Sequence, residues 1–131
     1  MTFDYGRSAS VFQRVQQKSG LSAKEADIIE KDVKRTFNDI PCLANEEGKD
    51  TLKKILTTLS KHSSSVGYTQ GMSNIVAALY YHADEVIAFE LVIRALNDYH
   101  LKEVHMKKLP GLDFHCDIIR LLIKENLPNL F

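Results

Sequence analysis

Residues 29–37 read IEKDVKRTF and residues 67–72 read GYTQGM. Asp32 and Arg35 are three positions apart, so on a helix they lie on neighbouring turns and can form an ion pair. By spacing alone, this pair is a surface salt bridge that contributes at most about 1 kcal/mol. Alternatively, Asp32 fixes the orientation of the Arg35 guanidinium, which then loses less rotamer entropy when it meets a phosphate group.

The second segment also allows two interpretations. It can be a glycine-flanked loop that merely starts a buried helix. It can also hold Gln70 at the exposed end of that helix, where the amide can reach into the active site of a partner. In that case Gly67 and Gly71 would leave room for close approach of a backbone, and the start of the helix would favour anionic groups.

Apolar side chains recur at helical spacing along most of the chain. We expect helices over 8–18, from the capping box of Ser22 and Glu25 to about Phe37, and over 46–62, 69–81, 85–97 and 113–127. Segment 69–81 is apolar on nearly all sides, which is typical of a central, buried helix. No segment alternates with a period of two, so the predicted fold class is all-α.

Four details of the chain can be checked in a structure. Pro41 should end the second helix, since the residue before a proline is pushed out of helical conformation. Asp84 should cap the helix over 85–97. The apolar face of 46–62 leaves Lys49, Lys53 and Lys54 on the other, polar face, and 102–108 reads as a polar connection.

Composition describes one ordinary globular domain over residues 1–131, with 44% hydrophobic and 26% charged residues. Seventeen basic and seventeen acidic residues cancel, which argues against nucleic acid as a partner, and no apolar run approaches the length for direct membrane insertion. Two isolated cysteines, Cys42 and Cys116, are typical of reduced thiols in a cytosolic protein. The N-terminus has no basic, apolar signal peptide pattern.

We expect neither a metal nor a cofactor. The five histidines form no metal-ligand spacing, so no metal site is predicted. The phosphate-loop pattern G-x-x-x-x-G-K-[ST] is absent, so the chain should not bind GTP itself.

Together, I-x-x-D-x-x-R-T-F and G-Y-x-Q-G-M resemble, in that order, the two catalytic signatures of the TBC domain, the fold of Rab GTPase-activating proteins. Further stretches are similar to the family: Leu52-x-x-Ile55-Leu56, Val66-Gly67-Tyr68, Ala88-Phe89-Glu90 and Leu109-Pro110-Gly111-Leu112. The resemblance covers roughly residues 11–131.

The resemblance implies a multi-helix TBC-type domain that activates a GTP-bound Rab-type small GTPase. Arg35 would be the arginine finger and Gln70 the glutamine finger, both supplied in trans, while GTP and Mg²⁺ belong to the partner. Asp32 would support Arg35, and Tyr68 would help to position the loop between Gly67 and Gly71. The implied setting is vesicle trafficking in the cytoplasm, with recruitment to endomembranes.

The chain departs from the family pattern in three ways. Asn38 follows Thr36-Phe37 where the family usually has proline, and the chain contains no tryptophan. TBC domains are also longer, with two helical lobes. We therefore expect 1–131 to be the N-terminal lobe, with the C-terminal lobe largely missing. This motivates an alternative function, a non-catalytic helical module that binds a GTPase or a scaffold.

The catalytic hypothesis makes geometric demands. Arg35 and Gln70 must converge on one exposed groove, with their functional groups within roughly 10 Å. Asp32 should lie within hydrogen-bonding reach of Arg35. The stripe of Ile29, Val33 and Phe37 should pack on the helix that follows Gln70.

Overall fold

The computed structural model describes residues 2–63, 65–106 and 108–130. Within these ranges the chain forms helices and no strands, which confirms the all-α prediction. The elements are α1 (Tyr5–Gln16), α2 (Ala23–Arg35), α3 (Pro41–Ala44), α4 (Glu46–His62), α5 (Met72–His82), α6 (Glu85–Asp98), α7 (Lys102–His105), α8 (Leu112–Asn126) and the 3-10 turn η1 (Pro128–Leu130).

Local hydrogen bonds at the helix starts follow the predictions. Ser22 Oγ accepts from the Glu25 N–H at 3.1 Å and Glu25 Oε2 accepts from the Ser22 N–H at 3.3 Å, so the capping box is present. The Asp84 carboxylate accepts from the N–H groups of Val86 and Ile87, in the first turn of α6, at 2.9 Å each. The bounds of α4 match the predicted segment 46–62.

Three helices depart from their predicted bounds by two or more residues, and two short helices were not predicted. α1 spans Tyr5–Gln16 rather than 8–18. α2 ends at Arg35 because Thr36 is extended, with a ψ of 120°, and Phe37 after it has a φ of 44°, which no right-handed helix can continue. α5 starts only at Met72 because Gly71 before it has a left-handed φ of 98°. α3 and α7 have four residues each, too few to produce a periodic apolar pattern.

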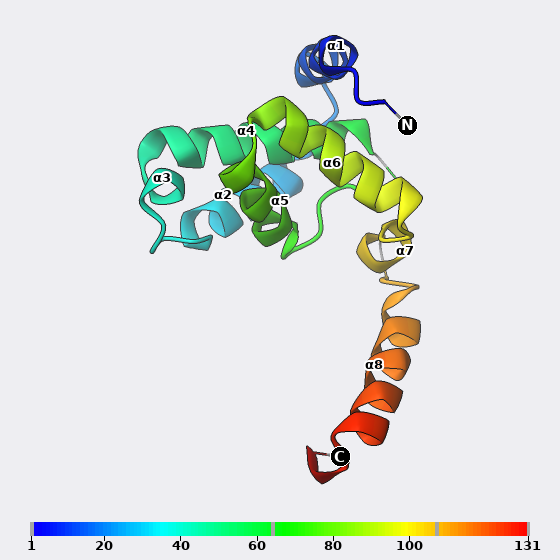
Figure 1. The fold of residues 1–131 in the computed structure, drawn as a ribbon. Helices are drawn as coiled ribbons and strands as arrows, with labels where there is room; N and C mark the ends of the chain where they lie inside the picture. Colours follow the sequence, from blue (N-terminus) through cyan, green and yellow to red (C-terminus); the bar gives the residue numbers. More distant parts are fainter. Residues whose placement is uncertain (1, 64, 107, 131) are drawn as a thin grey trace.

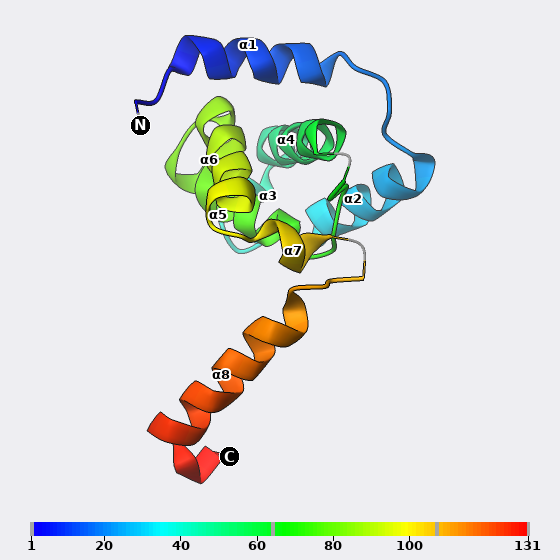
Figure 2. The same ribbon diagram turned by 90° about the vertical axis from the view of Figure 1, so that its right-hand side faces the viewer.

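The core is built around α4, which contacts α1, α2, α3, α5 and α6 (Figures 1 and 2). Its apolar residues Leu52, Ile55, Leu56 and Leu59 are fully buried. The prediction that segment 69–81 is the central helix is therefore wrong. α5 buries one side only, and Ile75 and Tyr81 on its other side are exposed.

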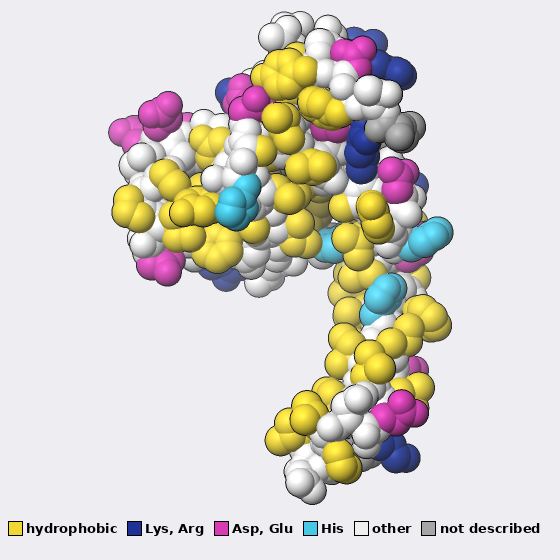
Figure 3. All heavy atoms as spheres, in the orientation of Figure 1, with side chains coloured by type: hydrophobic (Ala, Val, Ile, Leu, Met, Phe, Trp, Pro, Cys, Tyr) yellow, Lys and Arg dark blue, Asp and Glu magenta, His cyan; other side chains and the backbone are white. Residues whose placement is uncertain are grey.

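The last helix extends away from the body of the molecule (Figures 1 and 2). None of its residues is buried, and apolar side chains such as Phe114 and Leu121 are exposed along it (Figure 3). In the described part of the chain, no helix combines the length and the apolar character needed to cross a membrane.

Candidate functional site

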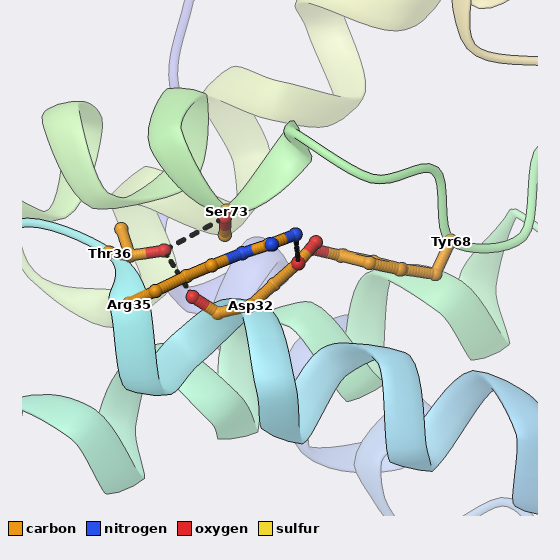
Figure 4. A network of polar contacts seen from close by, with 5 residues as sticks. All are labelled: Asp32, Arg35, Thr36, Tyr68 and Ser73. Carbon is orange, nitrogen blue, oxygen red and sulfur yellow. Dashed lines mark hydrogen bonds and ion pairs between the residues drawn. The ribbon is translucent and has the colours of Figure 1, made fainter.

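A buried carboxylate, Asp32, joins the two sequence segments (Figure 4). The residue is only 2% exposed. Its Oδ1 pairs with a terminal guanidinium nitrogen of Arg35, and its Oδ2 accepts a hydrogen bond of 2.6 Å from the Tyr68 hydroxyl. This confirms the predicted contact between Asp32 and Arg35. The pair is not an ordinary surface salt bridge, because one partner is buried while the Arg35 side chain is 60% exposed.

Tyr68 remains a hydrogen-bond donor at neutral pH. Burial raises the pKa of its hydroxyl, and the hydrogen bond that it donates to Asp32 raises it further, while a hydrogen bond from the backbone N–H of Ser73 to the phenol oxygen acts in the opposite direction. The net pKa lies well above the usual value for tyrosine. Tyr68 thus holds the carboxylate from the side opposite to Arg35.

A second hydrogen-bond chain ties the end of α2 to the start of α5. Thr36 Oγ1 lies 2.6 Å from the Asp32 carbonyl oxygen and 2.9 Å from Ser73 Oγ. A carbonyl cannot donate, so Thr36 donates its single proton to Asp32 and accepts from Ser73. Both hydroxyl residues are buried. The sequence reasoning missed this contact, although Thr36 belongs to the first motif.

Arg35 and Gln70 line one open pocket, as the sequence predicts. The pocket has a volume of about 230 Å³, below the roughly 300–1,000 Å³ of pockets that enclose a small molecule. The expected separation of the two functional groups stays a prediction. The full lining is Asp32, Arg35, Thr36, Gln70, Gly71, Ser73 and Asn74.

The two glycines beside Gln70 have different surroundings. Gly71 has a φ of 98°, and a Cβ there would meet no atom within 4 Å, so the space on this side of the backbone is open. Gly67 has a φ of 62°, and a Cβ there would lie 2.7 Å from Glu25 Oε1. The space at Gly67 is filled from within the chain. The expectation that it leaves room for a partner is therefore wrong.

Glu25 fastens the turn that carries Tyr68. Besides capping α2, its carboxylate accepts from the Ser60 hydroxyl at 3.1 Å and from the Tyr68 N–H. Burial alone would raise the pKa of Glu25, but the hydrogen bonds from Ser22, Ser60 and Tyr68 outweigh it and lower the pKa. The capping-box pattern in the sequence predicts only that Glu25 caps α2, and it does not predict the contacts with Ser60 and Tyr68.

The prediction that Lys49 lies on the polar face of α4 is wrong. Its Nζ donates to the carbonyl oxygens of Val33 and Thr36 at 2.8 and 2.5 Å, and to Asn38 Oδ1 at 2.7 Å. Burial lowers its pKa. The ammonium group therefore caps the end of the helix that carries Arg35. Lys53 behaves differently and forms a partly exposed ion pair with Glu30.

The apolar stripe of α2 packs as expected. Ile29 and Val33 are buried in the same core cluster as Met72 and Val76 of α5, and Phe37 packs against that cluster. α2 and α5 are in direct contact. Within the described ranges, no group of three His, Cys, Asp or Glu side chains could hold a metal ion.

Comparison with known proteins adds a family match. The model of the Rab-GTPase-TBC domain matches residues 3–131. The chain is 30% identical over 135 aligned positions to the GTPase-activating protein gyp2 of Schizosaccharomyces pombe, and 29% over 123 to GYP3 of Saccharomyces cerevisiae. It is 26% identical over 129 positions to the Rab GTPase-activating protein eat-17 of Caenorhabditis elegans.

These alignments cover most of this chain and little of the relatives. They include 95%, 88% and 98% of the chain, but only 18%, 19% and 13% of gyp2, GYP3 and eat-17. The chain thus spans less than a fifth of the length of these curated relatives.

Proposed function

The chain belongs to the Rab-GTPase-TBC domain family, and on that premise we propose that it activates a Rab-type small GTPase. In this proposal it binds the GTP-loaded partner and inserts Arg35 and Gln70 beside the γ-phosphate. GTP and Mg²⁺ are supplied by the partner. The arginine neutralises charge on the transferring phosphoryl group, and the glutamine orients the attacking water.

One observation carries the proposal: Arg35 and Gln70 line the same small, open pocket. A phosphoryl group and a water molecule have to meet both fingers at once, so fingers on separate faces could not cooperate. The pocket is too small to enclose a nucleotide, which fits a reaction centre completed by a second protein.

The surroundings of Arg35 also suit a finger. A guanidinium has five N–H donors, and the contact with Asp32 uses one terminal nitrogen. The remaining donors stay available for phosphate oxygens. Asp32 is itself held by Tyr68, so Arg35 is oriented before a partner arrives, and less side-chain entropy is lost on binding.

Gln70 lies exposed on the turn before α5. Gly71 follows it with a left-handed backbone and is the residue directly before α5, so the direction in which Gln70 projects is set by the start of α5. The helix dipole at this end favours an anionic partner group nearby.

The test is single-turnover GTP hydrolysis by a panel of Rab-type GTPases with and without this protein. Arg35→Ala should reduce the stimulated rate on the order of 10³-fold or more, the usual scale for an arginine finger. Arg35→Lys should be nearly as damaging, because a point charge lacks the planar fork of the guanidinium. Gln70→Ala should also reduce the rate.

A matched control lies on α8, where Asp117 and Arg120 form an exposed ion pair with the same D-x-x-R spacing. Arg120→Ala should leave stimulated hydrolysis unchanged. Hydrolysis that is insensitive to Arg35→Ala would contradict the catalytic role. If the protein bound the GTP-loaded partner without any acceleration, it would instead be a helical binding module.

We also infer a cytoplasmic location, with recruitment to the endomembranes where a Rab-type partner acts in vesicle trafficking. Cys42 and Cys116 are both exposed and unpaired, which suits a reducing compartment.

A further inference from the structure

The backbone directly after Arg35 is strained. Phe37 has a φ of 44°, in the left-handed region, which is unfavourable for a residue with a Cβ. Such positions persist only where the surrounding structure holds them, and they cluster at functional sites. Here the strained turn sets where α2 ends, and therefore the direction in which Arg35 leaves the helix.

Lys49 holds this turn from both sides. It donates to the Thr36 carbonyl before Phe37 and to the Asn38 side chain after it, and a third bond reaches the Val33 carbonyl in the last turn of α2. An ammonium group has three donors, so all of them are used here. A positive charge at this place also complements the negative end of the helix dipole.

The start of α4 is built to bring Lys49 to this position. A Cβ on Gly48 would lie 2.1 Å from the Cys42 carbonyl oxygen, so the glycine permits a close approach of α4 to α3. The Asn45 side chain fixes the same turn by accepting from the Gly48 N–H at 2.7 Å. Lys49 follows directly.

We propose that Lys49 is a positioning residue for Arg35. It does not line the pocket of Arg35 and Gln70, and it acts by fixing the end of α2 and the strained turn behind the finger. The inference rests on the proposed GTPase-activating function. It predicts that the loss of Lys49 misplaces Arg35 without removing any group that contacts the partner.

α4 also supplies a matched control. Lys53, one helical turn further on, pairs with Glu30 of α2 and so bridges the same two helices. Glu30 lies in the body of α2, away from the turn that follows Arg35. Lys49→Met and Lys53→Met each remove one bridge between α4 and α2, and only the first releases the end of α2.

The experiment titrates each variant against a responsive GTP-loaded Rab-type GTPase, well below the melting temperature of the variant. Lys49→Met should lower the maximal stimulated rate about 10- to 100-fold, because a misplacement of about 1 Å can cost 10²-fold. The half-saturating concentration should change little. Lys53→Met should change neither value, and Lys49→Arg should recover most of the rate, since a guanidinium can still donate to the carbonyls.

Two further measurements report on the turn without hydrolysis. Amide hydrogen exchange of residues 34–37 should become faster in Lys49→Met than in Lys53→Met, because only the former loses the cap. The NMR order parameter of the Arg35 Nε–H bond should fall in the same variant. If Lys49→Met does not fold, Asn38→Ala removes one acceptor of Lys49 and should give a smaller loss of maximal rate.

The outcomes separate this inference from the proposed function. If Arg35→Ala abolishes stimulation while Lys49→Met and Asn38→Ala leave the maximal rate unchanged, the inference is overturned and the function stands. If Arg35→Ala has no effect, the proposed function fails and the inference fails with it. An equal loss in Lys49→Met and Lys53→Met would also overturn it, because bridging of the two helices alone would then explain the effect.

Discussion

Asp32 of α2 and Tyr68 of the turn before α5 are joined by a hydrogen bond of 2.6 Å, which is formed between positions 36 apart in sequence. The carboxylate that receives it also pairs with Arg35. The two sequence motifs are thus parts of one physical unit. Tyr68, in the turn that carries Gln70, and Arg35 therefore contact the same buried side chain.

Tyr68→Phe should destabilise the fold by about 1–3 kcal/mol, because one oxygen of a buried carboxylate loses its donor. It should also lower stimulated hydrolysis, since Asp32 then holds Arg35 less firmly. Urea unfolding and a single-turnover assay measure the two effects. Tyr81→Phe is the control, because Tyr81 is half exposed and packs by its ring against His82. Equal stability of the two variants would contradict the prediction.

The raised pKa of Tyr68 predicts a loss of stability in alkali. Burial first, and then the bond to Asp32, favour the neutral hydroxyl in the folded state. Its contribution is complete below about pH 10, the ordinary pKa of tyrosine. Above that pH the unfolded chain loses this proton while the folded chain keeps it, so stability falls as the pH rises.

Free energies of unfolding between about pH 8 and 11 test this linkage. The advantage of the wild type over Tyr68→Phe should shrink as the pH rises through this range. In the difference between the two proteins, the contributions of other groups that titrate in this pH range cancel. Lys49 is one of them, because burial lowers its pKa. A constant difference between the two proteins would mean that Tyr68 titrates alike in both states.

The sequence predicts those parts of the fold that depend on contacts between residues close together in the chain. The capping box of Ser22 and Glu25, the Asp84 cap and the bounds of α4 involve residues only a few positions apart. The contact between Asp32 and Arg35 is of the same kind, since it spans three positions on one helix.

Contacts that depend on the assembled fold could not be predicted in this way. Thr36 and Ser73 are 37 positions apart, and nothing in the motif of either residue indicates the other. Lys49 and Lys53 lie one turn apart on the same face of α4, so periodicity gives them the same environment. Their separate roles arise because the end of α2 meets α4 beside Lys49 only.

Gly48→Ala should destabilise the protein by about 1–3 kcal/mol, although alanine favours helices, because the new methyl group would clash with backbone atoms of α3. Gly6→Ala in α1 is the control. Its new Cβ would have an ordinary contact of 3.6 Å with Asp4, so this change should be neutral or stabilising. Urea unfolding measures the stability of both variants. A Gly48→Ala protein as stable as the wild type would contradict the prediction.

Gly71→Ala should weaken both stability and GTPase activation, whereas Gly20→Ala should weaken stability alone. Both glycines have positive φ angles, 98° and 130°, and at neither would a Cβ meet an atom within 4 Å. Each substitution therefore strains the backbone without a clash, at a cost of roughly 1–2 kcal/mol. Only Gly71 adjoins Gln70, so relaxation of the strain there turns the glutamine away from the pocket that it shares with Arg35. Urea unfolding should give similar losses for the two variants, while single-turnover hydrolysis should fall only in Gly71→Ala. Equal hydrolysis in both would show that the orientation of Gln70 does not depend on the start of α5.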